Sequence, residues 1–234
     1  MKLKVCGMKE VENIKSIADL NPDYMGFIFY DQSKRNFEGI IPELPKSIKK
    51  TGVFVNEYVE IVVSLIEEYK LEAVQLHGDE SVEYIRLLKD AICLSAIDAE
   101  SRKKSQKRPL DSTRGDKSIE IIKVFGIKDD FDFEVLESYK NEVNYFLFDT
   151  KGEERGGNGV KFDWSVLKEY PYSKPFFLSG GIGPNDIQEI KKIKTTGLPI
   201  YAVDINSQFE SKPGLKEVNK VKEFKDIVIS NEIK

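Results

Sequence analysis

Two side chains in this sequence stand at the ends of apolar runs, where proton transfer is chemically feasible. Cys6 follows the run Leu3–Lys4–Val5, and Asp149 follows the run from Tyr145 to Phe148. A thiol can lose its proton and act as a base where cationic groups or helix N-termini lie nearby. A carboxyl group at the mouth of an apolar environment can keep its proton and act as an acid. The plainer alternatives stay open, since a buried cysteine is commonly a small apolar residue and an aspartate commonly caps a helix or loop.

A second chemical signal is a pair of segments suited to bind an anion. Ser179, Gly180 and Gly181 follow one apolar run, and the two glycines offer backbone N–H groups with no Cβ in the way. Asn206 and Ser207 follow the next run and can open a short helix whose N-terminus favours an anion. A Gly-Gly pair alone would indicate only a turn. Two such segments in consecutive loops predict a phosphate site.

Three further polar residues follow other apolar runs. Arg35 carries a planar guanidinium that suits a carboxylate, although most loop arginines are simply solvated. His77 could polarise a substrate, or it could pack in the interior. Asp204 could accept a hydrogen bond from a substrate, or it could cap the following helix. We expect these residues to line the same pocket as Cys6.

The elements that must position these residues are eight short apolar runs, most of which precede an amphipathic stretch of helical spacing. The runs cover residues 3–6, 24–30, 52–55, 71–76, 119–125, 143–148, 175–178 and 198–203. Continuous apolar runs fit strands that are buried on both faces and joined by crossover helices. Eight such units predict one (β/α)8 barrel spanning residues 1–234, with an open doubly wound sheet as the alternative. In a barrel the active site lies at the carboxyl ends of the strands, where the residues above would meet.

One stretch interrupts this rhythm. Residues 100–117 are polar and charged, and we expect a solvated loop or an extension of the preceding helix, on the face opposite the active site. A basic nucleic-acid patch is the weaker interpretation, because charge runs are usually solvated. Residues 91–97 could form a strand instead of helix, which would change the strand count.

Composition excludes several classes of function. Lys+Arg total 36 and Asp+Glu total 40, so the net charge of -4 argues against a nucleic-acid-binding surface. No apolar run approaches the roughly 20 residues of a spanning helix, and the first residues lack a signal-peptide core. The two cysteines, Cys6 and Cys93, suit a reducing cytoplasm rather than a disulfide scaffold. With His77 as the single histidine, most zinc and Ser-His-Asp sites are disfavoured.

Taken in order, eight segments resemble phosphoribosylanthranilate isomerase of tryptophan biosynthesis. They are KVCGMKEVENI (4–14), MGFIFYDQSKRNF (25–37), GVFVNE (52–57), VQLHGDE (74–80), LFDT (147–150), GGNGVKFDWS (156–165), LSGGIGPNDI (178–187) and VDINSQFESKPGLKE (203–217). They span nearly the whole chain, so the joint match is far more specific than any one motif.

The resemblance implies a (β/α)8 barrel that needs no cofactor or metal. It implies an Amadori rearrangement of N-(5-phosphoribosyl)anthranilate to 1-(2-carboxyphenylamino)-1-deoxyribulose 5-phosphate. By the same resemblance Cys6 is the general base, Asp149 the general acid and Arg35 the group that holds the anthranilate carboxylate. The phosphate-binding residues that it implies are Gly180, Gly181, Asn206 and Ser207.

The chain departs from the family pattern at three places. The family usually has a serine pair after the last strand, whereas this chain has Asn206 and Ser207. Backbone N–H contacts to phosphate would survive this change, but the first hydroxyl is lost. Lys34 replaces the proline common in the arginine loop, and the insertion at 100–117 is not part of the common pattern.

Two other functions remain as alternatives. One is another phosphosugar barrel enzyme, such as the histidine-pathway Amadori isomerase. That family uses paired aspartates as acid and base, so the cysteine at position 6 argues against it. The other is a non-catalytic protein that binds a phosphoribosyl ligand. Neither nucleic acid nor membrane is an expected partner, and the sequence leaves the oligomeric state open.

Overall fold

A closed barrel of eight parallel strands forms the centre of the computed structural model, which describes residues 1–105, 118–128, 130–150 and 163–228. The strands are β1 (Lys2–Val5), β2 (Tyr24–Phe29), β3 (Lys49–Phe54), β4 (Ala73–Leu76), β5 (Glu120–Ile127), β6 (Tyr145–Thr150), β7 (Phe176–Leu178) and β8 (Ile200–Ile205). Because β1 pairs with both β2 and β8, the sheet has no free edge. The predicted barrel is confirmed, and the open doubly wound sheet is wrong.

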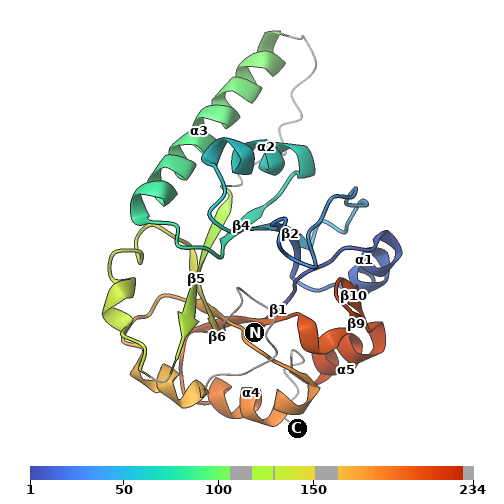
Figure 1. Ribbon diagram of the computed structural model, residues 1–234, viewed down its shortest axis with the longest axis vertical. Helices are drawn as coiled ribbons and strands as arrows, with labels where there is room; N and C mark the ends of the chain where they lie inside the picture. Colours follow the sequence, from blue (N-terminus) through green and yellow to red (C-terminus); the bar gives the residue numbers. More distant parts are fainter. Residues whose placement is uncertain (106–117, 129, 151–162, 229–234) are drawn as a thin grey trace.

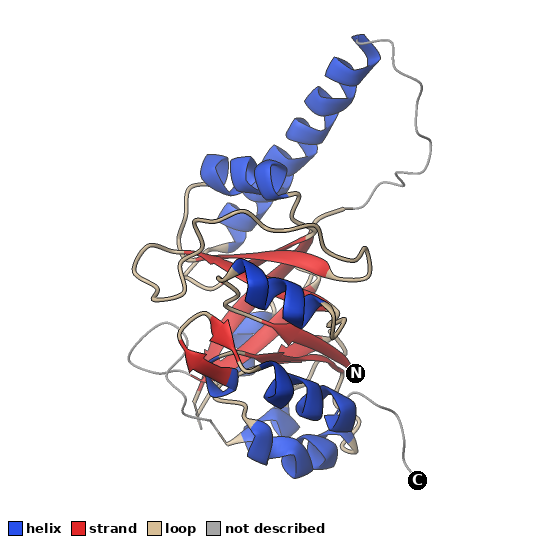
Figure 2. Ribbon diagram, turned by 90° about the vertical axis from the view of Figure 1, so that its right-hand side faces the viewer, coloured by secondary structure: helices blue, strands red, loops and turns tan. Residues whose placement is uncertain are grey.

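The helices cover the outside of the barrel (Figures 1 and 2). They are α1 (Val11–Ala18), α2 (Val59–Tyr69), α3 (Val82–Ser105), α4 (Ile187–Lys194) and α5 (Val218–Val228). Short 3-10 turns η1 (Phe133–Leu136), η2 (Trp164–Glu169), η3 (Pro184–Asp186) and η4 (Ser207–Phe209) lie in the connections, and a small hairpin, β9 (Glu210–Lys212) and β10 (Leu215–Lys216), precedes α5. The connection from β2 to β3 contains no helix, so not every strand is followed by one as a regular barrel would require. In the part of the chain with described structure, no helix combines the length and apolarity needed to cross a bilayer.

Helix α3 settles the uncertain segment between the fourth and fifth strands. It continues unbroken through residues 91–97, so the strand interpretation of these residues is wrong. The segment contains alanine and leucine and no glycine or proline that would end the helix. Residues 100–105 extend the helix, which was one of the two expectations, and 106–117 lie outside the described residues. The far half of α3 extends past α2 and away from the barrel, as Figure 1 shows at the top.

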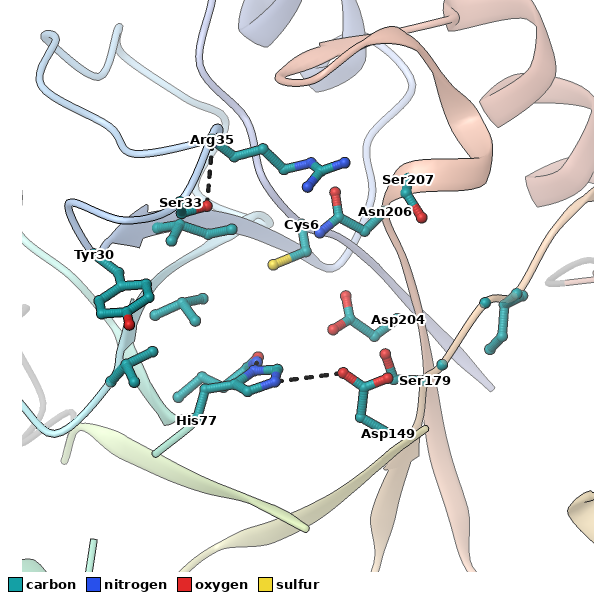
Figure 3. Close-up of a pocket in the computed structure, with 17 residues that line it drawn as sticks. Cys6, Tyr30, Ser33, Arg35, His77, Asp149, Ser179, Asp204, Asn206 and Ser207 are labelled. Carbon is teal, nitrogen blue, oxygen red and sulfur yellow. Dashed lines mark hydrogen bonds and ion pairs between the residues drawn. The ribbon is translucent and has the colours of Figure 1, made fainter. Parts of the chain in front are cut away.

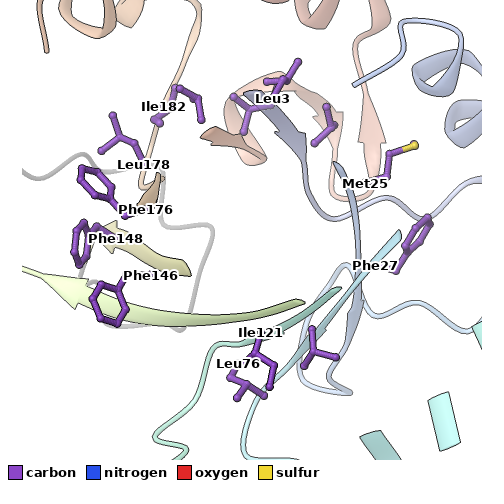
Figure 4. Close-up of a cluster of buried hydrophobic side chains, with 14 of the residues drawn as sticks. Leu3, Met25, Phe27, Leu76, Ile121, Phe146, Phe148, Phe176, Leu178 and Ile182 are labelled. Atoms are coloured by element: carbon purple, nitrogen blue, oxygen red, sulfur yellow. The ribbon is translucent and has the colours of Figure 1, made fainter. Parts of the chain in front are cut away.

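Side-chain alternation along the strands divides the core into two sets. One set points outward, toward the helices, and includes Leu3, Phe27, Phe146 and Phe176 (Figure 4). The inner set at the amino ends of the strands packs Tyr24, Leu147 and Phe177 together with its neighbours. Apolar and aromatic side chains fill this end of the interior, and the pocket described below lies toward the carboxyl ends.

Candidate active site

One pocket at the carboxyl ends of the strands brings together all of the site residues predicted from the sequence (Figure 3). They are Cys6, Arg35, His77, Asp149, Gly180, Gly181, Asp204, Asn206 and Ser207. Strand alternation explains their common direction, since residues two apart share a face. Cys6 therefore faces inward like Lys4, and His77 faces inward like Gln75. Figure 3 shows Cys6 and Asp149 pointing into the same space, with Asp204 beside them.

Lys4 and Asp204 form a buried ion pair next to Cys6. Nζ of Lys4 lies 2.9 Å from Oδ2 of Asp204, and the Lys4 side chain has 0% exposure. Burial would lower the pKa of Lys4, but the negative charge of Asp204 and the nearby thiol outweigh it and raise this pKa. Lys4 is therefore an ammonium in the interior of the barrel. The sequence prediction missed it, because a lysine within an apolar run carries no local sign that its charge is buried.

The Cys6 thiol experiences opposing influences. Burial is the largest, and it raises the pKa of Cys6 above that of an ordinary cysteine. Lys4 and Lys216 act in the opposite direction, whereas Asp204 adds to the rise. The cationic groups expected beside a basic cysteine are present, but burial outweighs them. Burial therefore favours the thiol form of Cys6 over the thiolate.

Asp204 is poised to receive a hydrogen bond. Its Oδ2 is held by Lys4, while Oδ1 is buried and has no hydrogen-bond partner among the described residues. Burial raises the pKa of Asp204, Lys4 opposes the rise, and the negative charge of Asp149 adds to it. An unpaired buried oxygen is costly unless a ligand satisfies it, so Oδ1 is suited to a ligand hydroxyl.

A chain of three side chains leads to Asp149. Nε2 of Gln75 lies 3.0 Å from Nδ1 of His77, and Nε2 of His77 lies 3.4 Å from Oδ2 of Asp149. The Gln75 amide nitrogen can only donate, so Nδ1 accepts and the proton of a neutral His77 sits on Nε2. His77 thus directs an N–H group at the Asp149 carboxylate. Gln75 was not among the predicted site residues, although its position two before His77 is a signal that could have found it.

Arg35 has a partner that the sequence did not predict. Its Nε lies 3.0 Å from both carboxylate oxygens of Glu210, and its Nη2 lies 2.7 Å from Oε2. Glu210 also accepts a hydrogen bond from Nζ of Lys216 and another from the backbone N–H of Gly214. Arg35 itself lines the pocket, as expected of a carboxylate anchor.

The two predicted anion loops lie side by side at the pocket. Gly180 and Gly181 have φ values of 90° and 63°, which side chains rarely tolerate. Among the described residues, no acceptor takes a hydrogen bond from the backbone N–H of Gly180, Gly181 or Ser207. The Asn206 side chain accepts a hydrogen bond at Oδ1 from Nζ of Lys216 at 2.9 Å, which leaves the N–H groups of its amide unused by this contact. The backbone N–H groups and the Asn206 amide N–H groups are therefore available to an anion.

An apolar wall completes the pocket on the side of β2 and β3. It consists of Ile28, Tyr30, Val53 and Val55. These residues alternate along the two strands, a period-two pattern that marks inward-facing positions and could have predicted the wall. Such a surface suits a flat aromatic ring. The pocket therefore offers an aromatic slot, a cation, an anion-binding loop pair and two groups capable of proton transfer.

Comparisons with known proteins agree with this geometry. The family model described as N-(5'phosphoribosyl)anthranilate (PRA) isomerase matches residues 3–113 and 107–226. The N-(5'-phosphoribosyl)anthranilate isomerase of Parabacteroides distasonis is 40% identical over 231 residues, covering 96% of this chain and 91% of the relative. That of Phocaeicola vulgatus is 36% identical and covers 93% of this chain and 92% of the relative.

Solved structures show the same relationship. Phosphoribosyl anthranilate isomerase from Thermotoga maritima has a TM-score of 0.73 and 29% identity, covering 98% of both chains. A second such isomerase, solved in complex with reduced 1-(o-carboxyphenylamino)-1-deoxyribulose 5-phosphate, has a TM-score of 0.70, 27% identity and 98% coverage of both chains. On the family model, the relatives and these structures together, the chain belongs to the N-(5'-phosphoribosyl)anthranilate isomerase family.

Proposed function

We propose that this protein catalyses the Amadori rearrangement of N-(5-phosphoribosyl)anthranilate in tryptophan biosynthesis. The observation that carries the proposal is the placement of Cys6 and Asp149 in one pocket that also holds a cation and an anion-binding loop pair. The product is 1-(2-carboxyphenylamino)-1-deoxyribulose 5-phosphate. A related isomerase binds a reduced form of this compound, which supports the choice of substrate.

Asp149 is the proposed general acid. It protonates the ring oxygen of the ribose, and the ring opens to an iminium ion. The N–H group that His77 directs at Asp149 then stabilises the carboxylate left behind.

Cys6 is the proposed general base. It removes the proton from C2 of the open-chain iminium ion, and the resulting enolamine tautomerises to the ketone. Because burial raises the pKa of Cys6, the ammonium of Lys4 is needed to make the thiolate accessible. An acid and a base positioned in this way typically contribute about 10²–10⁴-fold each to the rate.

The remaining residues bind the two ends of the substrate. Arg35 holds the anthranilate carboxylate, and the apolar wall packs against the ring. The phosphate is bound by the N–H groups of Gly180, Gly181 and Ser207, with Asn206 at the same loop. Oδ1 of Asp204 accepts a hydrogen bond from a ribose hydroxyl.

The chain acts as one domain that spans residues 1–234, in the cytoplasm, without nucleic-acid or membrane partners. Residues 100–105 of its polar stretch, 100–117, belong to α3, and the remainder, whose expected place is the face opposite the pocket, lies outside the described residues. The two cysteines support the cytoplasmic location, and the net charge of -4 supports the lack of a nucleic-acid partner.

Loss of fluorescence from freshly generated phosphoribosylanthranilate, on addition of purified protein, tests the proposal. We expect turnover without added metal or cofactor. Binding of the substrate with no product formed would instead support a phosphoribosyl-binding protein and contradict the enzyme. A histidine-pathway isomerase would convert its own substrate and leave phosphoribosylanthranilate unchanged.

A further inference from the structure

The carboxylate of Glu210 accepts hydrogen bonds from one edge of the Arg35 guanidinium. The contacts use Nε and Nη2 of Arg35, at 2.7–3.0 Å from the two oxygens of Glu210. The Glu210 side chain is 3% exposed and that of Arg35 is 14% exposed, so water competes little for this pair. Two parallel charge-assisted hydrogen bonds fix the plane of a guanidinium as well as its position.

Glu210 is itself held in place by the hairpin from which it projects. It accepts hydrogen bonds from Nζ of Lys216 and from the backbone N–H of Gly214. Burial alone would raise the pKa of Glu210, but the hydrogen bonds and positive charges of Arg35 and Lys216 outweigh it and lower this pKa. Glu210 is therefore a negative charge held by hydrogen bonds from Arg35, Lys216 and Gly214.

The pair leaves the other edge of the Arg35 guanidinium available. A guanidinium has five N–H donors in a planar fork. Among the described residues, none accepts a hydrogen bond from Nη1 of Arg35. Nη1 and the second N–H of Nη2 form an edge that can bind a second carboxylate in the same bidentate way.

The same network reaches the phosphate end of the pocket. Lys216 bridges Glu210 and Oδ1 of Asn206, which lies beside Ser207 in the anion-binding loop. Gly7 allows the side chains of Arg35 and Asn206 to approach the backbone between them. A Cβ at this position would lie 2.7 Å from Oδ1 of Asn206 and 2.8 Å from Cδ of Arg35. One chain of contacts thus sets the distance between the two anion anchors.

We propose that Glu210 is a positioning residue for the reaction: it orients Arg35 so that the free edge of the guanidinium meets the carboxylate of the substrate. Through Lys216 it also fixes the position of Arg35 relative to the phosphate loop at Asn206 and Ser207. The proposal rests on the proposed function, since it requires that Arg35 bind a carboxylate. The competing explanation is that Glu210 only holds the β9–β10 hairpin in place.

A pair of matched ligands separates these explanations. The first is reduced 1-(o-carboxyphenylamino)-1-deoxyribulose 5-phosphate, and the second is its phenylamino analogue, which lacks only the carboxyl group. In Glu210→Gln we expect the affinity for the first ligand to fall about tenfold or more and that for the second to stay within about twofold. For turnover we expect KM to rise by a similar factor, with a much smaller change in kcat.

Glu142→Gln is the matched control. Glu142 also pairs with an arginine and a lysine, through Nε of Arg86 at 2.9 Å and Nζ of Lys89 at 2.8 Å, but it does not line the pocket. We expect this variant to bind both ligands as the unmodified protein does. If Glu210→Gln fails to fold, Glu210→Asp keeps the charge, shortens the reach and should show the same selective loss.

Three results would overturn the proposal. Equal weakening of both ligands in the Glu210 variants would assign a purely structural role to Glu210. Unchanged binding of both ligands would show that Arg35 needs no orienting partner. If the unmodified protein bound both ligands equally well, Arg35 would not be a carboxylate anchor, and the proposed function would lose that element independently of Glu210.

Discussion

Nζ of Lys4 lies 2.9 Å from Oδ2 of Asp204, and this buried pair borders the thiol of Cys6. A buried ion pair is weak evidence of stability, because desolvation offsets most of the attraction. Its position beside the proposed base indicates a chemical role instead. Among the influences on the pKa of Cys6, the charge of Lys4 is the strongest that opposes burial.

Replacement of Lys4 by methionine should move the pH dependence of catalysis. The pKa of Cys6 is already raised by burial, and loss of the ammonium removes an influence that lowers it. Because the base must be deprotonated, the limb of kcat/KM that rises with pH should move to higher pH in Lys4→Met. If the pKa of Cys6 rises by about one, activity at neutral pH should fall about tenfold.

Lys4→Arg is the control, since it keeps the positive charge, and it should retain a profile closer to that of the unmodified protein. A Lys4→Met variant that folds and keeps the unmodified pH profile would contradict the role of Lys4. The free energy of unfolding of Lys4→Met should also be about 3–5 kcal/mol lower, because Asp204 is left buried without its partner. Chemical denaturation measures this difference.

The tautomer of His77 can be observed directly, because the chain contains a single histidine. Donation from Nε2 of Gln75 to Nδ1 places the proton of neutral His77 on Nε2, facing Asp149. Nitrogen-15 NMR of histidine-labelled protein should therefore detect the Nε2–H form. In Gln75→Leu we expect a mixture of tautomers and about a tenfold or larger loss in kcat, in line with the contribution of a positioned acid. An Nδ1–H form in the unmodified protein would contradict this arrangement.

Much of this arrangement follows from local sequence signals. The eight apolar runs predicted the strands, and the polar residues after them predicted a shared pocket because parallel strands end on one side. Boundaries were less accurate where strands begin with polar residues. β3 starts at Lys49, before the apolar run, because Lys49 pairs with Glu120 and Thr51 is buried in the barrel.

The parts of the site that were missed depend on contacts between distant segments. Lys4 is buried as an ion only because Asp204 lies next to it, 200 residues later in the chain. Glu210 meets Arg35 across 175 residues. The sequence next to Lys4 or Glu210 gives no indication of the distant residue with which each one pairs. Long-range ion pairs of this kind become visible only once the barrel closes β8 onto β1.

Gly180→Ala should damage both stability and catalysis. Its φ of 90° is strained for alanine, and the added Cβ would lie 2.3 Å from Oγ1 of Thr150 and 3.1 Å from Oδ1 of Asp149. We expect the free energy of unfolding to fall by about 1–3 kcal/mol from backbone strain alone and to fall further because of the clash. Gly197→Ala is a matched control, because Gly197 has a φ of 79° and no atom within 4 Å of the added Cβ.

Thermal unfolding and steady-state kinetics of the two glycine variants check this prediction. Gly197→Ala should lower stability and leave kcat and KM unchanged, whereas Gly180→Ala should also raise KM and lower kcat. Equal kinetics in the two variants would show that the loop after β7 does not position the phosphate or Asp149.

At the opposite end of the barrel, Tyr24→Phe should affect stability without affecting turnover. The Tyr24 hydroxyl donates to Oε2 of Glu120 at 2.9 Å and lies 3.1 Å from the hydroxyl of Tyr201. Removal of one partner from a buried network costs about 1–3 kcal/mol. Urea denaturation should show this loss while kcat remains within about twofold of the unmodified value. A large fall in kcat would mean that the two ends of the barrel are coupled.

The central claim is that Cys6 and Asp149 transfer the protons of the isomerisation. It is tested most directly by the fluorescence assay of phosphoribosylanthranilate turnover with Cys6→Ala and Asp149→Ala, each verified as folded by circular dichroism. We predict that each variant loses about 10²-fold or more in kcat, because each lacks one of the two proton-transfer groups. Turnover at the unmodified rate by either folded variant would contradict the claim.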